Sequence, residues 1–124
     1  MTAPAEYVRT IEPGESLPAL VEETKARAWI EEVEFAIVRL ITGERIMVRG
    51  DRDGIEFLTD QDETQLFMNH HGGLVQVARV YFHTHPRVTG PLDDDFKVLK
   101  ILEQTRFYIF EIGGEPQGTL VRPK

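Results

Sequence analysis

The chain has 124 residues, no cysteine and a formal net charge of −7. This length fits one compact domain, residues 1–124, and the absence of cysteine excludes disulfides and thiolate metal ligands. The acidic balance argues against nucleic-acid binding, and without a signal peptide or a membrane-length apolar run we expect a cytoplasmic protein that contacts no membrane.

The first half of the chain predicts a short strand, one helix and an antiparallel meander of three strands. Ser16 is a typical helix N-cap, and apolar residues recur at helical spacing behind it. The run Val-Glu-Phe-Ala-Ile-Val-Arg-Leu-Ile that follows is rich in β-branched residues and predicts a buried strand. Thr42-Gly43 and the Asp-Arg-Asp-Gly run at 51–54 are turn sequences. The expected elements are a strand at 7–11, a helix at 17–30, and strands at 33–41, 44–49 and 55–59.

The second half predicts a short helix that carries Leu66 and Phe67. Asp60 or Asp62 is its expected cap, and Gly72-Gly73 its expected end. After a long strand, apolar residues at helical spacing predict a further helix, whose acidic first turn suits the helix dipole. The remaining elements are strands at 74–85, 107–112 and 119–122, and a helix at 93–104.

These elements predict an α+β fold, a mixed β-sheet flanked by about three helices in a single domain. Trp29 and the aromatic residues of 107–110 are expected in its core.

His83 and His85 are the main chemical signal. Residues at i and i+2 of a strand point to the same face, so two imidazoles can bind one metal ion. A catalytic zinc ion usually has three protein ligands and keeps a fourth position for water. Asp93, Asp94 and Asp95, at the start of the expected helix, are the nearest source of the third ligand.

Each of these features also has a purely structural interpretation. The three aspartates can cap the helix and complement its dipole. His70-His71 suggests a second metal site, although a polar helix end before Gly72-Gly73 is the simpler interpretation. Glu32 and Glu34 can be surface charges at a strand end.

The segment His83-Thr84-His85-Pro86, followed by Pro91 and by an acidic residue that opens a helix, resembles the motif of the JAMM/MPN (JAB) zinc metalloproteases. The order of elements is also similar over residues 17–112, although only 83–95 is specific in sequence. The resemblance implies a JAMM/MPN-like domain of the prokaryotic single-domain type, with a cytidine deaminase-like fold.

The resemblance assigns roles to individual residues. His83 and His85 would bind Zn2+ with a downstream aspartate, and an upstream glutamate would take a proton from the zinc-bound water and deliver it to the leaving amine. Glu34 is preferred as this catalytic base because the apolar strand begins directly after it; Glu32 is the second candidate.

The aspartate is harder to assign. Strict counting puts the family's serine position at Asp93 and its aspartate position at Phe96, which cannot bind zinc. A loop shorter by one residue puts them at Leu92 and Asp95, and we choose this register, with Asp94 as the alternative. In the family, the serine helps to stabilise the oxyanion of the tetrahedral intermediate. This register leaves no serine at that position, so Thr89 or a backbone N–H would have to take this role. Ile37 stands where the family usually has glycine.

The expected function is therefore that of a zinc-dependent metallopeptidase or isopeptidase. Its substrate would be a protein or peptide, with a ubiquitin-like or carrier-type protein beside the scissile bond. The alternative is a weak or inactive JAMM-fold binding module that acts through protein–protein interaction, in line with the missing serine. An amidohydrolase or phosphoesterase is disfavoured, because further histidines should then follow the pair.

Overall fold

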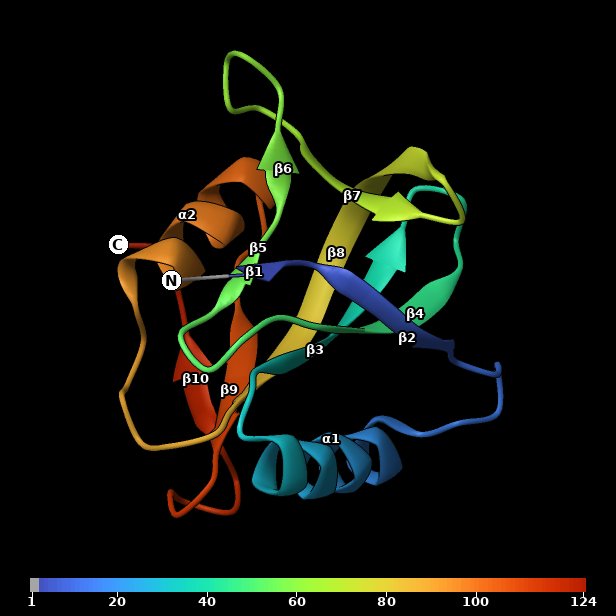
Figure 1. Cartoon of the computed structure of the whole chain (residues 1–124). Helices are drawn as coiled ribbons and strands as arrows, with labels where there is room; N and C mark the ends of the chain where they lie inside the picture. The colour runs from blue at the N-terminus through green and yellow to red at the C-terminus, as the bar shows by residue number, and fades with distance from the viewer. Residues whose placement is uncertain (1–2) are drawn as a thin grey trace.

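A computed structural model describes residues 3–124 (Figure 1). These residues form two helices rather than the three expected, and most of their strands join one eight-stranded sheet. The helices are α1 (Leu17–Glu31) and α2 (Asp93–Leu102), and the strands are β1 (Ala3–Pro4), β2 (Glu6–Thr10), β3 (Phe35–Leu40), β4 (Arg45–Arg49), β5 (Ile55–Glu56), β6 (Leu58–Thr59), β7 (Leu66–His70), β8 (Gly73–His85), β9 (Phe107–Glu111) and β10 (Thr119–Val121).

The sheet is mixed, which confirms the α+β class. Its main path runs β10-β9-β8-β3-β4-β2, and β7 pairs with the first part of β8. β8 and β9 are parallel, whereas the other pairs in this sheet are antiparallel. The connection between the two parallel strands contains α2, the usual form of a crossover between parallel strands.

Strand β3 is apolar on both sides because both faces of the sheet are covered. Phe35 and Ile37 pack with buried residues of α1, whereas Ala36 and Val38 belong to the cluster that contains residues of α2. Figure 1 shows α1 at the bottom and α2 at the upper left of the sheet. A strand buried on both faces loses the apolar–polar alternation, which explains the continuous apolar run in the sequence.

The prediction of a helix around Leu66 and Phe67 is wrong, because these residues begin strand β7. Asp60 does cap a local structure, but its Oδ1 accepts hydrogen bonds from the N–H groups of Thr64 (2.6 Å) and Gln65 (2.9 Å) and closes a loop. His71 and Gly72 have φ values of 52° and 79°, and they join β7 to β8. Two adjacent positive φ values are typical of a two-residue hairpin turn, so Gly72 turns a hairpin and does not end a helix.

Two further expectations are corrected. The segment 55–59 does not complete the meander: β5 pairs with β1 and β6 with β7, while β2 occupies the free edge of β4. Trp29 is 70% exposed and is not a core residue. It lies in the last turns of α1, beyond the buried stripe that ends with Ala28. Of the aromatic residues at 107–110, Phe107 is buried, but Tyr108 points to the other face of β9 and is exposed.

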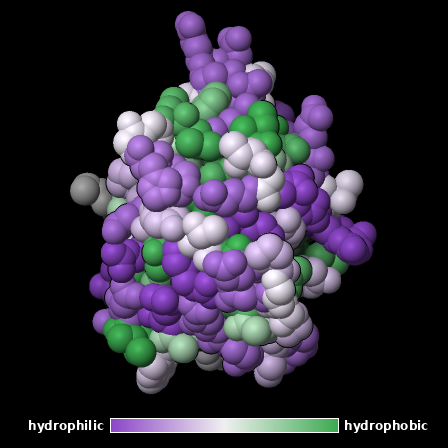
Figure 2. All heavy atoms as spheres, turned by 90° about the vertical axis from the view of Figure 1, so that its right-hand side faces the viewer, coloured by the Kyte–Doolittle hydropathy of each residue, from purple (hydrophilic) through white to green (hydrophobic). Residues whose placement is uncertain are grey.

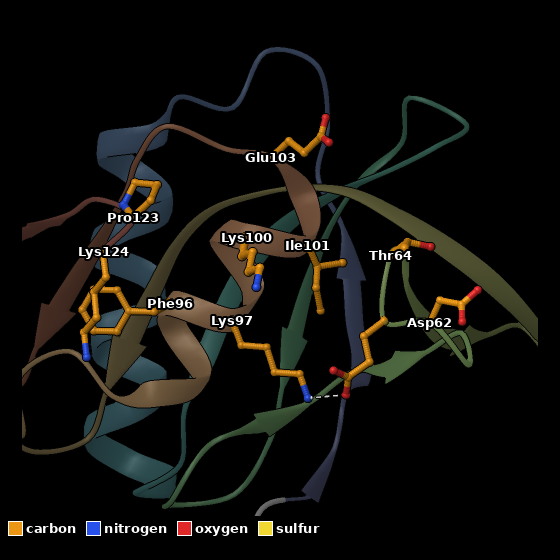
Figure 3. Close-up of a pocket in the computed structure, with 10 residues that line it drawn as sticks. Asp62, Thr64, Phe96, Lys97, Lys100, Ile101, Glu103, Pro123 and Lys124 are labelled. Carbon is orange, nitrogen blue, oxygen red and sulfur yellow. Dashed lines mark ion pairs between the residues drawn. The ribbon is translucent and has the colours of Figure 1, made fainter.

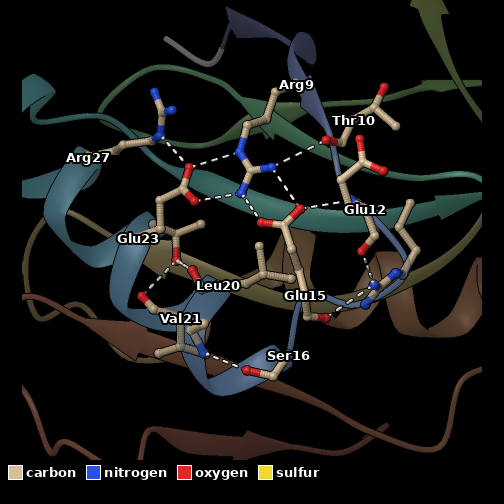
Figure 4. A network of polar contacts seen from close by, with 12 residues as sticks. Arg9, Thr10, Glu12, Glu15, Ser16, Leu20, Val21, Glu23 and Arg27 are labelled. Carbon is tan, nitrogen blue, oxygen red and sulfur yellow. Dashed lines mark hydrogen bonds and ion pairs between the residues drawn. The ribbon is translucent and has the colours of Figure 1, made fainter.

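The start of α1 is held against β2 by a charged network (Figure 4). Arg9 Nη2 lies 2.6 Å from both Glu15 Oε1 and Glu23 Oε1, and Arg27 Nε lies 3.0 Å from Glu23 Oε2. The hydrogen bond from Arg9 lowers the pKa of the Glu15 carboxyl to about 2, and it also lowers that of Glu23. The network is thus formed only while both carboxyl groups are ionised.

The free energy of unfolding is expected to decrease as the pH falls from about 5 towards 2, and part of this decrease should come from the Arg9 network. A carboxyl group with a depressed folded-state pKa stabilises the fold above its unfolded pKa and loses that contribution as the pH approaches its folded pKa. Urea unfolding at several pH values checks this. Arg9→Met should flatten the pH dependence in this window. Arg106→Met, at an exposed arginine, should not; equal pH profiles for Arg9→Met and the wild type would contradict the prediction.

Within residues 3–124, neither helix is long and apolar enough to cross a membrane. Figure 2 shows the face on the right-hand side of Figure 1, where hydrophilic residues predominate and hydrophobic ones form separate small patches. This face, at the β2 edge of the sheet, therefore offers no broad apolar surface.

Candidate metal centre

The end of β8 places two histidines on one side of the sheet. His83 and His85 are 4% and 1% exposed, and both lie on the face that carries α2. Thr84 between them points to the opposite face, where its hydroxyl donates to Thr24 Oγ1 of α1 at 2.9 Å. The strand alternation therefore directs both imidazoles to one point and uses the intervening threonine to hold α1.

Glu34 reaches this point from the residue before β3. Its backbone N–H donates to Asp51 O at 2.9 Å, and its carbonyl accepts from Gly50 N at 3.0 Å. These bonds fix Glu34 against the turn that follows β4, and a Cβ on Gly50 would collide with the carbonyl oxygen of Gly54. The buried carboxylate has its Oε1 3.6 Å from His83 Nδ1 and 3.7 Å from His85 Nε2.

Asp95 approaches from the first turn of α2. Its Oδ2 accepts a hydrogen bond of 2.8 Å from Leu92 N, and its Oδ1 lies 3.5 Å from His83 Nδ1. Asp95 is buried, whereas Asp93 and Asp94 are exposed. Of the three aspartates considered as ligands, Asp95 is thus the one beside the histidines, and it caps the helix at the same time.

The arrangement can hold a metal ion. One ligand atom each from Glu34, His83 and His85 lie within 4.8 Å of one another. Ligand atoms around a tetrahedral zinc ion lie about 3.3 Å apart, close to the carboxylate–histidine separations of the site. Nε2 of His85 and both ring nitrogens of His83 are buried without a hydrogen-bond partner among residues 3–124. Buried polar atoms are normally paired, so the two nitrogens that face the carboxylates, His83 Nδ1 and His85 Nε2, indicate a ligand between them.

The carboxylates also set the electrostatics of the site. Burial disfavours the protonated imidazole of His83, but the adjacent Glu34 and the negative charge of Asp95 outweigh burial and raise its pKa. A site that attracts a proton in this way also attracts a metal cation. The site therefore favours a positive charge between Glu34 and Asp95.

Glu111, at the end of β9, is a site residue that the sequence analysis missed. The parallel register places it beside His85, whose Nδ1 lies 3.1 Å from Glu111 Oε2. Burial opposes ionisation of Glu111, but N–H donors from Thr89 and Gly90 and the contact with His85 lower its pKa. An ionised Glu111 can only accept a hydrogen bond, so it favours the His85 tautomer with the proton on Nδ1 and the lone pair on Nε2, as in carboxylate–histidine–metal arrangements. The sequence does contain a signal for Glu111: it alternates with the apolar residues Phe107 and Ile109 and so shares their inward face of the strand.

The other sequence candidates lie elsewhere or are already engaged. Glu32 is the exposed, left-handed C-cap of α1, so it does not share a strand face with Glu34. His70 pairs with Glu44 at 3.0 Å and contacts the tilted ring of His71, and it is not part of the cluster of Glu34, His83 and His85. Ile37 is buried on the α1 face of β3.

The position assigned to the family's serine is Leu92, which offers no hydroxyl. Thr89, the other candidate for oxyanion stabilisation, donates its hydroxyl hydrogen to Gly90 O at 3.0 Å, and its Oγ1 lies 3.2 Å from His85 Nδ1. Its hydroxyl therefore supports the His85 side of the site and is not a free donor.

Two hollows are relevant to access. A cavity of about 200 Å³ is lined by Glu34 and His85 together with Arg52, Asp53, Arg87 and Leu92. A wider hollow of about 1020 Å³ lies over α2 and is lined by Lys97, Lys100 and Lys124 (Figure 3). No residue of the metal cluster lines the wider hollow, and Lys97 is paired with Glu63 at 2.9 Å. The smaller cavity is therefore the approach to the site.

Searches against protein-family models, curated proteins and solved structures find no significant match to the chain. The functional assignment therefore depends on the site itself and on the motif around His83 and His85.

Proposed function

We propose that this protein is a zinc-dependent metallopeptidase of the JAMM type, which hydrolyses a peptide or isopeptide bond. The observation that carries the proposal is the placement of two unpartnered histidine nitrogens between two buried carboxylates, Glu34 and Asp95. One carboxylate is enough to complete a three-residue ligand set. The other is then available to move a proton. Metal-assisted hydrolysis requires both tasks, metal binding and proton transfer.

We assign His83, His85 and Asp95 as the zinc ligands. Two imidazoles and a carboxylate, with a fourth position left for water, are a ligand set that catalytic zinc uses. A bound zinc ion would act as a Lewis acid and lower the pKa of a water molecule towards ~7. Glu111 would keep the proton of His85 on Nδ1 and leave Nε2 free to bind the metal.

Glu34 is assigned as the general base. It accepts a proton as the oxygen of the attacking water bonds to the carbonyl carbon of the substrate. It then passes this proton to the leaving nitrogen as the C–N bond breaks, so that the products are a carboxylic acid and an amine. Its carboxylate lies beside both histidines and on the wall of the small cavity, where a substrate would enter.

The order of the elements supports the JAMM assignment. The glutamate lies between α1 and β3, the histidines lie at the end of β8, and the aspartate lies in the first turn of α2. This is the order implied by the family motif. We propose a protein or peptide substrate, with a ubiquitin-like protein on the carbonyl side of the bond, and a cytoplasmic location.

The second candidate is a catalytically weak or inactive binding module of the same fold. It is favoured by the two positions considered for oxyanion stabilisation: Leu92 stands at the serine position and has no hydroxyl, and the Thr89 hydroxyl is already bonded. Loss of one oxyanion donor costs about 100- to 1000-fold in turnover in well-studied hydrolases.

The direct test uses zinc-loaded protein and ubiquitin-like substrates that carry either a linear C-terminal extension or a lysine-linked isopeptide. Mass spectrometry should detect a new C-terminus, a chelator should stop its formation, and added zinc should restore it. Full zinc occupancy with no cleavage of any substrate would favour the binding module instead.

A further inference from the structure

Two surface loops form the rim of the cavity beside the metal centre. One is the turn at residues 51–54, and the other is the loop at 86–90 that follows His85. Both contribute an arginine to the cavity, Arg52 from the first loop and Arg87 from the second. The rim thus carries two guanidinium groups in a chain whose net charge is −7.

The first loop is fixed relative to Glu34. Asp51 Oδ1 accepts hydrogen bonds from the N–H groups of Asp53 (2.8 Å) and Gly54 (3.2 Å), which closes the turn. The carbonyl of Asp51 accepts the N–H of Glu34 at 2.9 Å. Arg52 therefore lies in a turn whose backbone is hydrogen-bonded directly to the proposed general base.

The second loop is fixed relative to His85. Glu111 Oε2 accepts the N–H groups of Thr89 at 2.8 Å and Gly90 at 2.9 Å, and the same oxygen contacts His85 Nδ1 at 3.1 Å. In the sequence, Arg87 lies between His85 and Thr89, the residues that Glu111 contacts. The loop that carries the second arginine is therefore attached to the metal site by one carboxylate.

The rim also carries the Asp53 carboxylate, which interacts electrostatically with both arginines. Arg87 Nη2 contacts Asp53 Oδ1 at 3.3 Å and so joins the two loops across the cavity. Arg52 has no hydrogen-bond or ion-pair partner among residues 3–124. A guanidinium group presents a planar set of donors that matches a carboxylate bidentately, and it cannot lose its charge near neutral pH.

We infer that Arg52, together with Arg87, forms a subsite for a substrate carboxylate next to the scissile bond. This inference rests on the proposed function, and it narrows the substrate class to peptides that carry an anionic group close to the reacting carbonyl. The anion is either the free C-terminus of the substrate or the side chain of an aspartate or glutamate residue.

The experiment compares four short peptides of the same length in zinc-loaded protein. One ends in a free carboxylate and one in an amide, and the other two are C-terminal amides with aspartate or asparagine after the scissile bond. We expect kcat/KM to be at least tenfold higher for the carboxylate member of one pair, since a charge-assisted hydrogen bond is worth that much. The pair that shows the preference identifies the source of the carboxylate.

Arg52→Gln should bring this ratio towards one, and Arg87→Gln should reduce it. Arg79→Gln, at an exposed arginine of β8 outside the cavity, is the matched control and should keep the wild-type ratio. The zinc content of each variant is measured in parallel. Equal rates for acid and amide in the wild type would overturn the subsite, as would a preference that survives in Arg52→Gln, because the metal itself would then bind the carboxylate.

Failure of the proposed function has a different signature. If the wild type cleaves none of the peptides, its equilibrium binding to the same peptides still tests the subsite. At least tenfold tighter binding of a carboxylate peptide than of its neutral partner, lost in Arg52→Gln, would support the subsite without peptidase activity. Equal binding of acid and amide would overturn it.

Discussion

Replacement of His85 by alanine is expected to abolish stoichiometric zinc binding, with an affinity loss of at least about 100-fold. The side chain supplies one of two histidine nitrogens at the site, and its ring is oriented by Glu111 and Thr89. Alanine leaves Glu34 and Asp95 facing an incomplete ligand set, and loss even of outer partners of a metal ligand costs about 10- to 100-fold in affinity. Metal analysis of purified protein and titration against a chromogenic chelator measure this change.

His71→Ala is the matched control, because His71 is exposed on the β7–β8 turn and should retain one zinc ion per chain. Asp95→Ala should weaken zinc binding more than Asp94→Ala, since only the first carboxylate lies beside His83. Retention of zinc by a folded His85→Ala variant would exclude the centre described above. A stronger effect at Asp94 would show that the ligand is displaced by one residue.

Glu34→Gln is expected to reduce turnover by about 100- to 10,000-fold while zinc remains bound. Glutamine keeps the shape of the side chain but cannot accept the proton of the attacking water, and general-base catalysis contributes a factor of this size. The backbone bonds of residue 34 to Gly50 and Asp51 do not involve the side chain, so the local fold should persist. Steady-state kinetics and zinc content are measured on the same preparation.

Glu32→Gln separates the two candidate bases, because Glu32 is exposed at the C-cap of α1 and should behave as the wild type. Loss of zinc in Glu34→Gln would instead mean that Glu34 is a ligand. That outcome would fit the close grouping of Glu34 with His83 and His85. Asp95 would then be the carboxylate left to move the proton.

Local patterns predicted the helices at 17–30 and 93–104 well, because each has an N-terminal signal and an apolar stripe that packs on the sheet. Local patterns failed at residues 66–70, because Asp60 and Gly72-Gly73 fit the ends of a helix as well as they fit the turns on either side of β7. The outcome there depends on β8, which pairs residue by residue with β7, from Leu66 opposite Val77 to His70 opposite Gly73. Strand pairing between distant segments is not visible in a local pattern.

In the candidate site, too, some features follow from local sequence and others from the pairing of distant segments. Strand periodicity is a local property, so the spacing of His83 and His85 was sufficient to put both imidazoles on one face. The position of Asp95 in the first turn of a helix was also readable from its neighbours. The approach of Glu34 depends on the antiparallel pairing of β3 with β8, and that of Glu111 on the parallel pairing of β9 with β8. These carboxylates come from segments that are distant in sequence, and the register of a sheet, which results from packing of the whole domain, brings them to the histidines.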